Sequence, residues 1–469
     1  MPANSWPEND SYNDLDPLNS LLSELAVEDD SLETRTSSVS SPYRFKNRRR
    51  KAAIALTIVW SSTIALHLLS FGSSVVLGLT TLLGIHAFLV VFTRPRTATD
   101  VVTDSLPFVS ILVSAKNEEA VIGNLVENLC NLKYPQNLYE VWMIDDGSSD
   151  GTAAILSKFA QKYQHLKILR RSANAGGGKS GALNQVLPLT KGEIIAVFDA
   201  DAQVPLDTLT QVVPLFSRPQ IGAVQMRKAI ANAPKNFWTK GQMAEMAVDT
   251  YLQYQRTCIG GIGELRGNGQ FVRRQALESF GGWNEETITD DLDLTMRLHL
   301  NGWDIECVFH PAVQEEGVTN AIALWHQRNR WAEGGYQRYL DYWDLILKNR
   351  MGGWKTWDMF LFMLMQYLLP TAAIPDLLMA AIRHRPPMLV PVTSLAFTMS
   401  MTGMAVGLAR IQRLEARPLN YFAIALQTLR GTLYMLHWVV VMGSTTARMC
   451  IFPKKLKWVK TVHQGSQLS

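Results

Sequence analysis

Residues 52–93 form the longest uncharged stretch of the 469-residue chain and contain no Asp, Glu, Lys or Arg. A single α-helix of this length would be roughly 60 Å long, about twice the thickness of the apolar core of a bilayer. The stretch therefore predicts two membrane-spanning helices, within residues 44–95, that turn near residues 71–74. Basic residues lie at both ends of the stretch, and such residues favour the cytoplasmic side of a membrane. We expect both ends of this helical pair to face the cytosol.

Three more apolar segments lie toward the C-terminus, at residues 357–382, 388–409 and 420–446. Both linkers between them are basic, so the distribution of charge does not decide how many of the three cross the membrane. Pro370 and Pro375 make the first segment the weakest candidate, because proline interrupts a helix unless its surroundings satisfy the backbone. Two or three transmembrane helices are expected in this block.

The two ends of the chain differ in charge. The C-terminal helical block, residues 356–447, is followed by a basic tail, residues 448–469, which we expect in the cytosol. The first 42 residues carry nine acidic side chains and one arginine, with frequent Ser, Asn and Pro. Such a composition buries too little apolar surface to offset the entropy lost on ordering, so residues 1–43 are predicted to be a disordered acidic tail.

Cysteine and charge content exclude two classes of protein. The four cysteines, Cys130, Cys258, Cys307 and Cys450, include no CxxC pair, which argues against a zinc site and predicts reduced thiols. The net charge of +4 is too small to indicate nucleic-acid binding, and the basic residues cluster beside apolar segments. A lipid bilayer is therefore the expected partner.

Between the two apolar blocks, residues 105–318 are predicted to form a doubly wound α/β domain. Apolar, β-rich runs separated by helical patterns occur at residues 107–115, 139–145, 193–200 and 221–226. Strands buried on both faces have this composition because helices cover both sides of the sheet. Ligands bind such sheets beyond the carboxyl ends of the strands, so polar residues at those ends are candidates for function.

The first two strands both end in polar segments. The first is followed by "SAKNEE", which contains Asn117 and Glu119, and the second by "DDGSSDGT", which contains Asp146. Asn117 and Glu119 equally suit the capping of a following helix, and two carboxylates before a glycine are common in ordinary turns. These two segments alone are weak evidence for a site.

The third strand ends in "AVFDADAQV", which places Asp199 and Asp201 two residues apart. Burying neighbouring carboxylates without a cation is costly, and a divalent metal such as Mg²⁺ or Mn²⁺, with diphosphate oxygens completing its shell, would remove that cost. A solvated β-turn is the alternative. Upstream, "NAGGGKSGALNQ" contains Lys179 after a run of glycines, which suits either an anion-binding loop or a flexible surface loop.

Two later segments add further candidate site residues. "GNGQFVRRQAL" suits a tight turn, and "ETITDDLDLTMRLHL" predicts a helix that begins at Asp290 and Asp291. Carboxylates are favoured at a helix N-terminus by the helix dipole alone. The functional alternative is that one of them is a general base.

The ordered set of these motifs, completed by "QRNRW" at residues 327–331 and placed between apolar blocks, resembles the membrane-integral family 2 glycosyltransferases, which include cellulose and hyaluronan synthases. The resemblance covers about residues 105–335. It implies a GT-A fold in which Asp146 contacts the uridine of a UDP-sugar. It also implies that Asp199 and Asp201 hold the diphosphate and its Mg²⁺ or Mn²⁺.

The same resemblance assigns the remaining site residues. Asp291 matches the catalytic base of the T-[ED]-D motif, with Asp290 where many relatives have Glu. Arg330 is expected to stabilise the charge that develops on the departing diphosphate, and Trp331 to form a wall of the acceptor entrance. The expected UDP-sugar site comprises Asn117, Glu119, Asp146, Lys179, Asp199, Gln327 and Arg330, and the acceptor site Asp290 and Trp331.

The resemblance implies an inverting, UDP-sugar-dependent hexosyltransferase with a cytosolic catalytic domain. Residues 319–355, which carry the Q-x-x-R-W motif, are expected to form interfacial helices, although tryptophans at headgroup depth would explain their composition without catalysis. The small membrane block leaves little material for a polymer channel and favours a lipid acceptor. The resemblance to members of the family that glucosylate lipids implies that glucose passes from UDP-glucose to diacylglycerol. A small processive β-glycan synthase and an inactive nucleotide-sugar sensor or scaffold are the alternatives.

Overall fold

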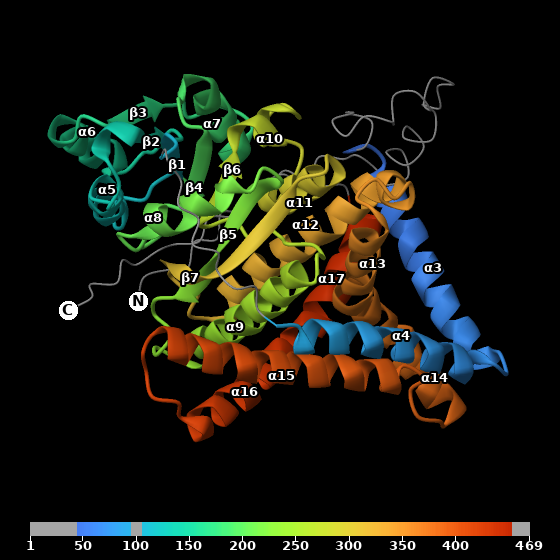
Figure 1. Ribbon diagram of the computed structural model, residues 1–469. Coiled ribbons are helices and arrows are strands. Elements are labelled where there is room, and N and C mark those ends of the chain that lie inside the picture. The colour runs from blue at the N-terminus through green and yellow to red at the C-terminus, as the bar shows by residue number, and fades with distance from the viewer. Residues whose placement is uncertain (1–44, 95–105, 453–469) are drawn as a thin grey trace, which may run out of the picture.

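The computed structural model describes residues 45–94 and 106–452 (Figure 1). The predicted acidic tail and residues 453–469 of the predicted basic tail lie outside these residues. A seven-stranded sheet between residues 109 and 315 lies between long apolar helices that precede and follow it in the chain. The predicted α/β domain inserted between two apolar helical blocks is confirmed.

The sheet is mixed, with the strand order β3-β2-β1-β4-β6-β5-β7. All its pairings are parallel except those of β6, which runs antiparallel to β4 and β5. The strands are β1 (Val109–Ala115), β2 (Tyr139–Asp145), β3 (Leu166–Arg170), β4 (Ile194–Phe198), β5 (Ile221–Ile230), β6 (Gln270–Arg273) and β7 (Asp304–Glu315). The four predicted apolar runs are β1, β2, β4 and β5. The sequence analysis missed β3 and β6, which are too short to show a clear period, and β7.

Helices cover both faces of the sheet because alternate strand residues point to opposite sides. Ile111 and Val113 of β1 belong to one core, and Leu112 belongs to the other. The first core packs against α5 (Ile122–Cys130), α6 (Thr152–Lys162) and α8 (Thr208–Val212). The second packs against α7 (Gly178–Val186), α10 (Arg274–Glu278) and α11 (Asp290–Leu300).

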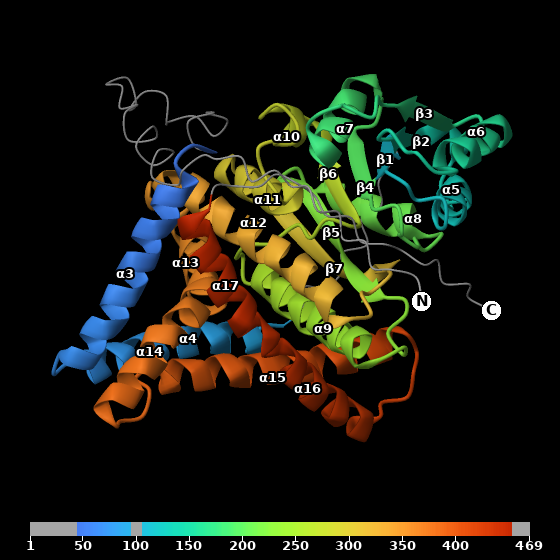
Figure 2. The ribbon, with the colours of Figure 1, turned by 180° about the vertical axis from the view of Figure 1, so that it is seen from behind.

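Two long helices join the sheet to the apolar helices. They are α9 (Phe237–Cys258) and α12 (Ala321–Leu347). Figures 1 and 2 show both between β7 and the C-terminal helices. Helix α9 packs against β5 and β7 on one side and against α15 (Val390–Leu414) and α16 (Tyr421–Met435) on the other. Helix α12 packs against α11 and α17 (His437–Ile451). The sheet and the apolar block therefore share these two helices.

Within the described residues, four helices are long and apolar enough to cross a membrane. They are α3 (Arg48–Leu68), α4 (Gly72–Phe92), the continuous helix Gly353–Arg383, and α15 (Val390–Leu414). The continuous helix consists of α13 (Gly353–Met363), a π-helical turn (Leu364–Leu368) and α14 (Leu369–Arg383). The turn predicted near residues 71–74 lies between α3 and α4, and Figure 1 shows the two helices diverging from it.

Two of the three C-terminal apolar segments differ from expectation. The segment predicted to be the weakest candidate, residues 357–382, lies within the continuous helix. The segment 420–446 is instead divided at Leu436 into α16 (Tyr421–Met435) and α17 (His437–Ile451), and neither is as long as the four candidate spans. The C-terminal block therefore contains two candidate spans and a pair of shorter helices.

Buried ion pairs connect the apolar helices to the helices that adjoin the sheet. The guanidinium of Arg48 at the start of α3 binds both carboxylate oxygens of Asp341 on α12, with Nε 2.8 Å from Oδ1 and Nη2 2.5 Å from Oδ2. Arg256 on α9 binds Asp358 on α13 in the same way, with an Nη2–Oδ2 distance of 2.8 Å. All four side chains are almost completely buried.

Removal of one partner of such a pair is expected to destabilise the protein strongly. Asp341→Ala leaves the Arg48 charge buried without its counter-ion, which should cost about 3–5 kcal/mol, whereas the double replacement Arg48→Met/Asp341→Leu should regain most of that loss. Thermal unfolding in detergent measures both. Glu127→Ala, which breaks an exposed pair with Lys162, is the control and should leave the Tm unchanged. An Asp341→Ala variant as stable as wild type would contradict this role.

Candidate active site

The candidate residues gather at one edge of the sheet. Strands β1, β2 and β4 are parallel neighbours, so their carboxyl ends lie side by side. Asn117 and Glu119 follow β1, Asp146 follows β2, and Asp199 follows β4. The polar strand ends that the sequence separates by up to 82 positions are therefore adjacent in the fold.

Asn117 and Glu119 connect the loop after β1 to the loop after β2. Asn117 has φ = 56°, a left-handed conformation that asparagine tolerates, and its Oδ1 accepts the N–H of Ser149 at 2.8 Å. Glu119 Oε2 accepts the N–H of Gly151 at 2.7 Å. Both bonds run to the loop that leads into α6, and Gly151 is the residue directly before that helix, so the two side chains support the start of α6.

Asp146 is held by an arginine that the sequence analysis did not single out. Arg171 Nη1 lies 2.5 Å from Asp146 Oδ1, and Nη2 of the same guanidinium donates to the carbonyl of Gly176 at 2.5 Å. Arg171 follows β3 directly, and nothing in its local sequence distinguishes it from a surface arginine. It fixes both the Asp146 carboxylate and the glycine-rich segment before α7.

Lys179 contacts Asp199. Gly177 and Gly178 have φ values of 78° and 53°, which glycine adopts without strain, and they allow the sharp turn that starts α7. Lys179 in the first turn of that helix places its Nζ 2.6 Å from Asp199 Oδ1. Burial alone would lower the pKa of Lys179, but the carboxylates of Asp199 and Asp290 outweigh it and raise the pKa. The ammonium is therefore firmly charged.

Asp291 is the carboxylate with the most strongly raised pKa at this edge. Burial, followed by the neighbouring carboxylate of Asp290, raises the pKa of Asp291 to about 6. Its Oδ1 accepts the N–H of Leu292 at 2.9 Å, which opposes that shift. The predicted helix beginning at Asp290 is confirmed as α11. A carboxylate with a pKa near neutrality is suited to accept and release a proton.

Arg330 of α12 belongs to the same electrostatic group. Burial lowers the pKa of Arg330, and the carboxylates of Asp199, Asp291 and Asp290 oppose that effect. Helix α12 approaches the start of α11 closely because Gly334 has no side chain: any Cβ there would collide with Thr289, the residue before Asp290. The structure thus brings Arg330 of the Q-x-x-R-W motif beside the T-D-D motif.

The donor atoms at the end of β4 suit a divalent cation that arrives with phosphate. Asp199 and Asp201 supply carboxylate oxygens, and the Asp201 Oδ2 accepts the N–H of Glu316 at 3.1 Å. Residues 45–94 and 106–452 contain no group of three or more His, Cys, Asp or Glu side chains able to hold a metal ion. Mg²⁺ is often held by one or two carboxylates together with substrate phosphates, so two aspartates are sufficient.

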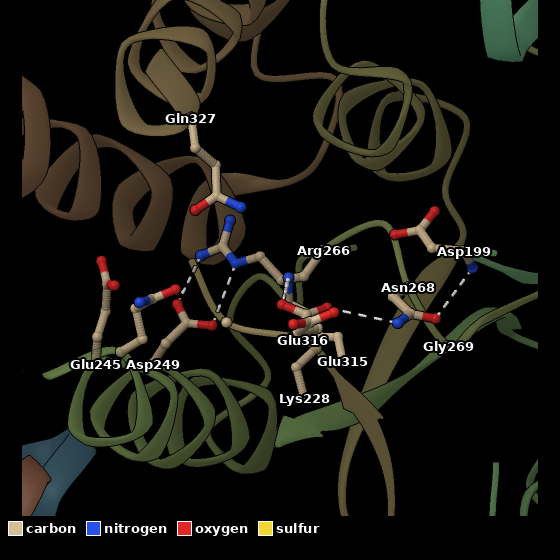
Figure 3. Close-up of polar contacts among 12 residues, drawn as sticks. Asp199, Lys228, Glu245, Asp249, Arg266, Asn268, Gly269, Glu315, Glu316 and Gln327 are labelled. Carbon is tan, nitrogen blue, oxygen red and sulfur yellow. Dashed lines mark hydrogen bonds and ion pairs between the residues drawn. The ribbon is translucent and has the colours of Figure 1, made fainter. Parts of the chain in front are cut away.

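A group of residues missed by the sequence analysis lies below Asp199 (Figure 3). Asn268 is fully buried, and its Oδ1 accepts the N–H of Asp199 at 3.2 Å while its Nδ2 lies 3.5 Å from Glu315. Glu315 Oε1 in turn lies 3.2 Å from Lys228 Nζ. Asn268 belongs to "GNGQ", whose glycines indicated a turn, but no local signal predicted its bond to the Asp199 backbone.

A second chain of charges connects α9 with α12. Arg266 Nη2 lies 2.9 Å from Asp249 Oδ1 and 2.7 Å from Glu264 Oε2, as Figure 3 shows for Asp249. Glu264 also binds Arg338 of α12 at 2.8 Å. Since these residues lie in three separate segments, their pairing has no signature in the sequence.

Gln327 and Trp331 lie on α12 beside this group. Gln327 Oε1 accepts a hydrogen bond of 2.7 Å from Arg328, and the Trp331 ring packs near Ile230 and Met246. The Nζ of Lys228 lies 5.0 Å from the centroid of the Trp331 ring. Trp331 is therefore held against β5 and α9, while the assignment of Gln327 to a UDP-sugar site stays a prediction.

Comparison with known proteins agrees with this arrangement. The family model described as "Glycosyltransferase like family 2" matches residues 107–334. The chain is 71% identical over 467 residues to a β-monoglucosyldiacylglycerol synthase of Trichormus variabilis, covering 99% of this chain and 100% of that protein. It is 53% identical to a synthase of the same name from Synechocystis sp., covering 99% and 97%.

A solved structure shares the fold. The mannosyltransferase PcManGT from Pyrobaculum calidifontis, in complex with GDP-Man and Mn²⁺, superposes with a TM-score of 0.52 at 21% identity. The match covers 81% of this chain and 99% of that chain, so it extends well beyond the sheet.

The raised pKa of Asp291 predicts a gain in stability on neutralisation. Its folded-state pKa of about 6 lies above the roughly 3.9 of an unfolded aspartate, so its contribution is present at low pH and is lost as the pH rises through 6. Asp291→Asn keeps an oxygen for the Leu292 N–H and should raise the Tm at pH 8 by about 2–4 °C. The gain should vanish near pH 4. Equal Tm values for variant and wild type at pH 8 would contradict this interpretation, and Glu127→Gln is the control.

Proposed function

The chain belongs to the group of family 2-like glycosyltransferases that contains the β-monoglucosyldiacylglycerol synthases, and on that premise we propose that it transfers glucose from UDP-glucose to 1,2-diacylglycerol. The product is β-monoglucosyldiacylglycerol. One observation in the site carries the proposal: Asp291, a carboxylate with a raised pKa, neighbours the cations Lys179 and Arg330 at the edge of a sheet that adjoins long apolar helices.

Asp291 acts as the general base. A carboxylate with a pKa near 6 is ionised at neutral pH and is still basic enough to accept a proton from a hydroxyl that becomes more acidic as it attacks. The acceptor oxygen bonds to the anomeric carbon on the face opposite the diphosphate, and its proton passes to Asp291. Attack from that face inverts the centre, so an α-linked donor gives a β-linked product.

Lys179 and Arg330 stabilise the leaving group. As the bond between the sugar and the diphosphate breaks, negative charge accumulates on the diphosphate, and fixed cations in a partly buried site lower the energy of that state. Both side chains lie near the carboxylates of Asp199, Asp290 and Asp291. These carboxylates outweigh the effect of burial on the pKa of Lys179, which is raised, and only partly offset it for Arg330, whose pKa is lowered. Arg330 can offer two parallel N–H groups to phosphate oxygens, which a lysine cannot.

Asp199 and Asp201 would hold Mg²⁺ or Mn²⁺. When bound, the ion would neutralise part of the diphosphate charge and fix its orientation. Asn268 supports this role because its Oδ1 accepts a hydrogen bond from the backbone N–H of Asp199.

The nucleoside is proposed to bind at the ends of β1 and β2. Asp146 would contact uridine, and the Arg171 guanidinium holds its carboxylate in place. Asn117 and Glu119 accept hydrogen bonds from the loop between β2 and α6, beside Asp146. These bonds support a positioning role for both residues at the UDP-sugar site.

The acceptor is proposed to approach from the apolar helices along α12. Trp331 would form a wall of its path, with Asp290 near its polar end and Gln327 at the UDP-sugar site. The basic start of α3 favours a cytosolic position for the catalytic domain. A processive β-glycan synthase is the second candidate, favoured only by the Q-x-x-R-W motif, and the full-length likeness to lipid glucosyltransferases weighs against it.

Product partition tests the function directly. Purified protein in detergent, given radiolabelled UDP-glucose, diacylglycerol and Mg²⁺, should place label in one chloroform-soluble glycolipid. Asp291→Asn removes the base and should lower the rate by about a hundredfold or more, with the KM for UDP-glucose little changed. Label in a water-insoluble polymer would instead support the glycan synthase.

The pH dependence of the reaction follows from the pKa of Asp291. Because the base must be ionised, kcat/KM should rise with pH through about 6 and then level off. Asp290→Asn removes one of the two causes of the raised pKa, so the rising limb should move to lower pH. Rate profiles between pH 4.5 and 8 for wild type, Asp290→Asn and the distant control Glu127→Gln measure this shift. A limb at the same pH in all three would refute the assignment.

A further inference from the structure

Arg328 is a fully buried residue at a position that the Q-x-x-R-W motif leaves open. Its guanidinium forms an ion pair with Glu245 of α9, and its Nη2 also donates to Tyr434 Oη of α16 at 3.1 Å. A guanidinium does not lose its charge in proteins, so burying it without such partners would be very costly. The pair therefore fixes Arg328 relative to α9 and α16.

Glu245 is the centre of this cluster. Its Oε1 accepts the Nε1–H of Trp438 at 2.7 Å, and its Oε2 accepts the hydroxyl of Tyr434 at 3.1 Å. Four helices, α9, α12, α16 and α17, therefore meet at one carboxylate. The division of the last apolar segment at Leu436 lies between the two residues that bind it, Tyr434 and Trp438.

The same guanidinium contacts two residues of the motif. Arg328 Nη1 donates to Gln327 Oε1 at 2.7 Å, and its guanidinium carbon lies 4.0 Å from the centroid of the Trp331 ring. Lys228 Nζ lies 5.0 Å from the same centroid. Attraction between a cation and an indole strengthens when water is excluded, so the buried Arg328 is the stronger of the two contacts.

We propose that Arg328 is a positioning residue for the acceptor lipid. By holding the Trp331 indole, it sets the shape of the acceptor path without contacting the reacting atoms. This inference rests on the proposed transfer to diacylglycerol, in which Trp331 forms a wall of that path. On the donor side, Lys179 and Asp199 bind each other, and Arg328 contacts Gln327 of the predicted UDP-sugar site.

Loss of the contacts made by Arg328 should therefore weaken acceptor binding far more than donor binding. Arg328→Gln alone leaves Glu245 buried without its counter-ion, so the decisive variant is the double replacement Glu245→Gln/Arg328→Gln, which removes both charges. We expect the KM for diacylglycerol to rise about tenfold. The KM for UDP-glucose, and the rate of UDP-glucose hydrolysis without acceptor, should change much less than this, because Lys179 and Asp199 hold each other independently of Arg328.

The matched control is Arg256→Gln/Asp358→Asn. It neutralises another buried pair, also anchored on α9, in which Asp358 accepts the N–H of Ile262 and Arg256 lies against Phe362. This variant should lose comparable Tm but keep the wild-type KM for diacylglycerol. A wild-type acceptor KM in the Glu245→Gln/Arg328→Gln protein, or an equal rise in both double variants, would overturn the proposal. Failure of the proposed function would show separately, as wild-type protein that hydrolyses UDP-glucose but makes no glycolipid.

Discussion

Buried arginine–carboxylate pairs along α12 determine how the catalytic sheet meets the apolar helices. An exposed ion pair contributes little to stability, but a buried charge that loses its partner is very costly, so each buried pair strongly favours one arrangement of the helices that carry it. The pairs on α12 are Arg328 with Glu245 of α9, Arg338 with Glu264 after α9, and Asp341 with Arg48 of α3. They tie α12 to the sheet domain and to the first apolar helix at the same time.

The active site depends on the position of α12 because its charged residues come from two separate parts of the chain. The strand ends and α7 supply Asp199 and Lys179, whereas Arg330 arrives from α12. Gly334 lets α12 lie directly against Thr289, so a helix that also contacts the apolar block brings its arginine to the start of α11. On the proposed function, a soluble nucleotide-sugar and a membrane-dissolved lipid must meet at one point, and α12 is the element common to both sides.

The sequence analysis predicted features that are specified locally, and it missed residues whose contacts lie far away along the chain. The apolar runs, the helix at Asp290 and the polar strand ends were recognisable because each is specified within about ten residues, and the structure brings the residues that carry them together. The roles assigned to them stay predictions. Arg171, Asn268 and Glu245 were missed because their function depends on partners far along the chain. The break at Leu436 was missed because no glycine or proline marks it; its neighbours bind Glu245 of α9.

The ion pair between Lys179 and Asp199 bears on how the sugar donor would bind. Asp199 is a proposed ligand of the divalent cation, yet its Oδ1 binds the Lys179 ammonium at 2.6 Å. Lys179 thus supplies positive charge beside this partly buried carboxylate. Asp290 and Asp291 also raise the pKa of Lys179, so these two causes stay in place when Lys179 leaves Asp199. On the proposed function, arrival of a diphosphate with its metal would let Lys179 exchange one anionic partner for another, so the charge balance of the site is preserved while the donor binds.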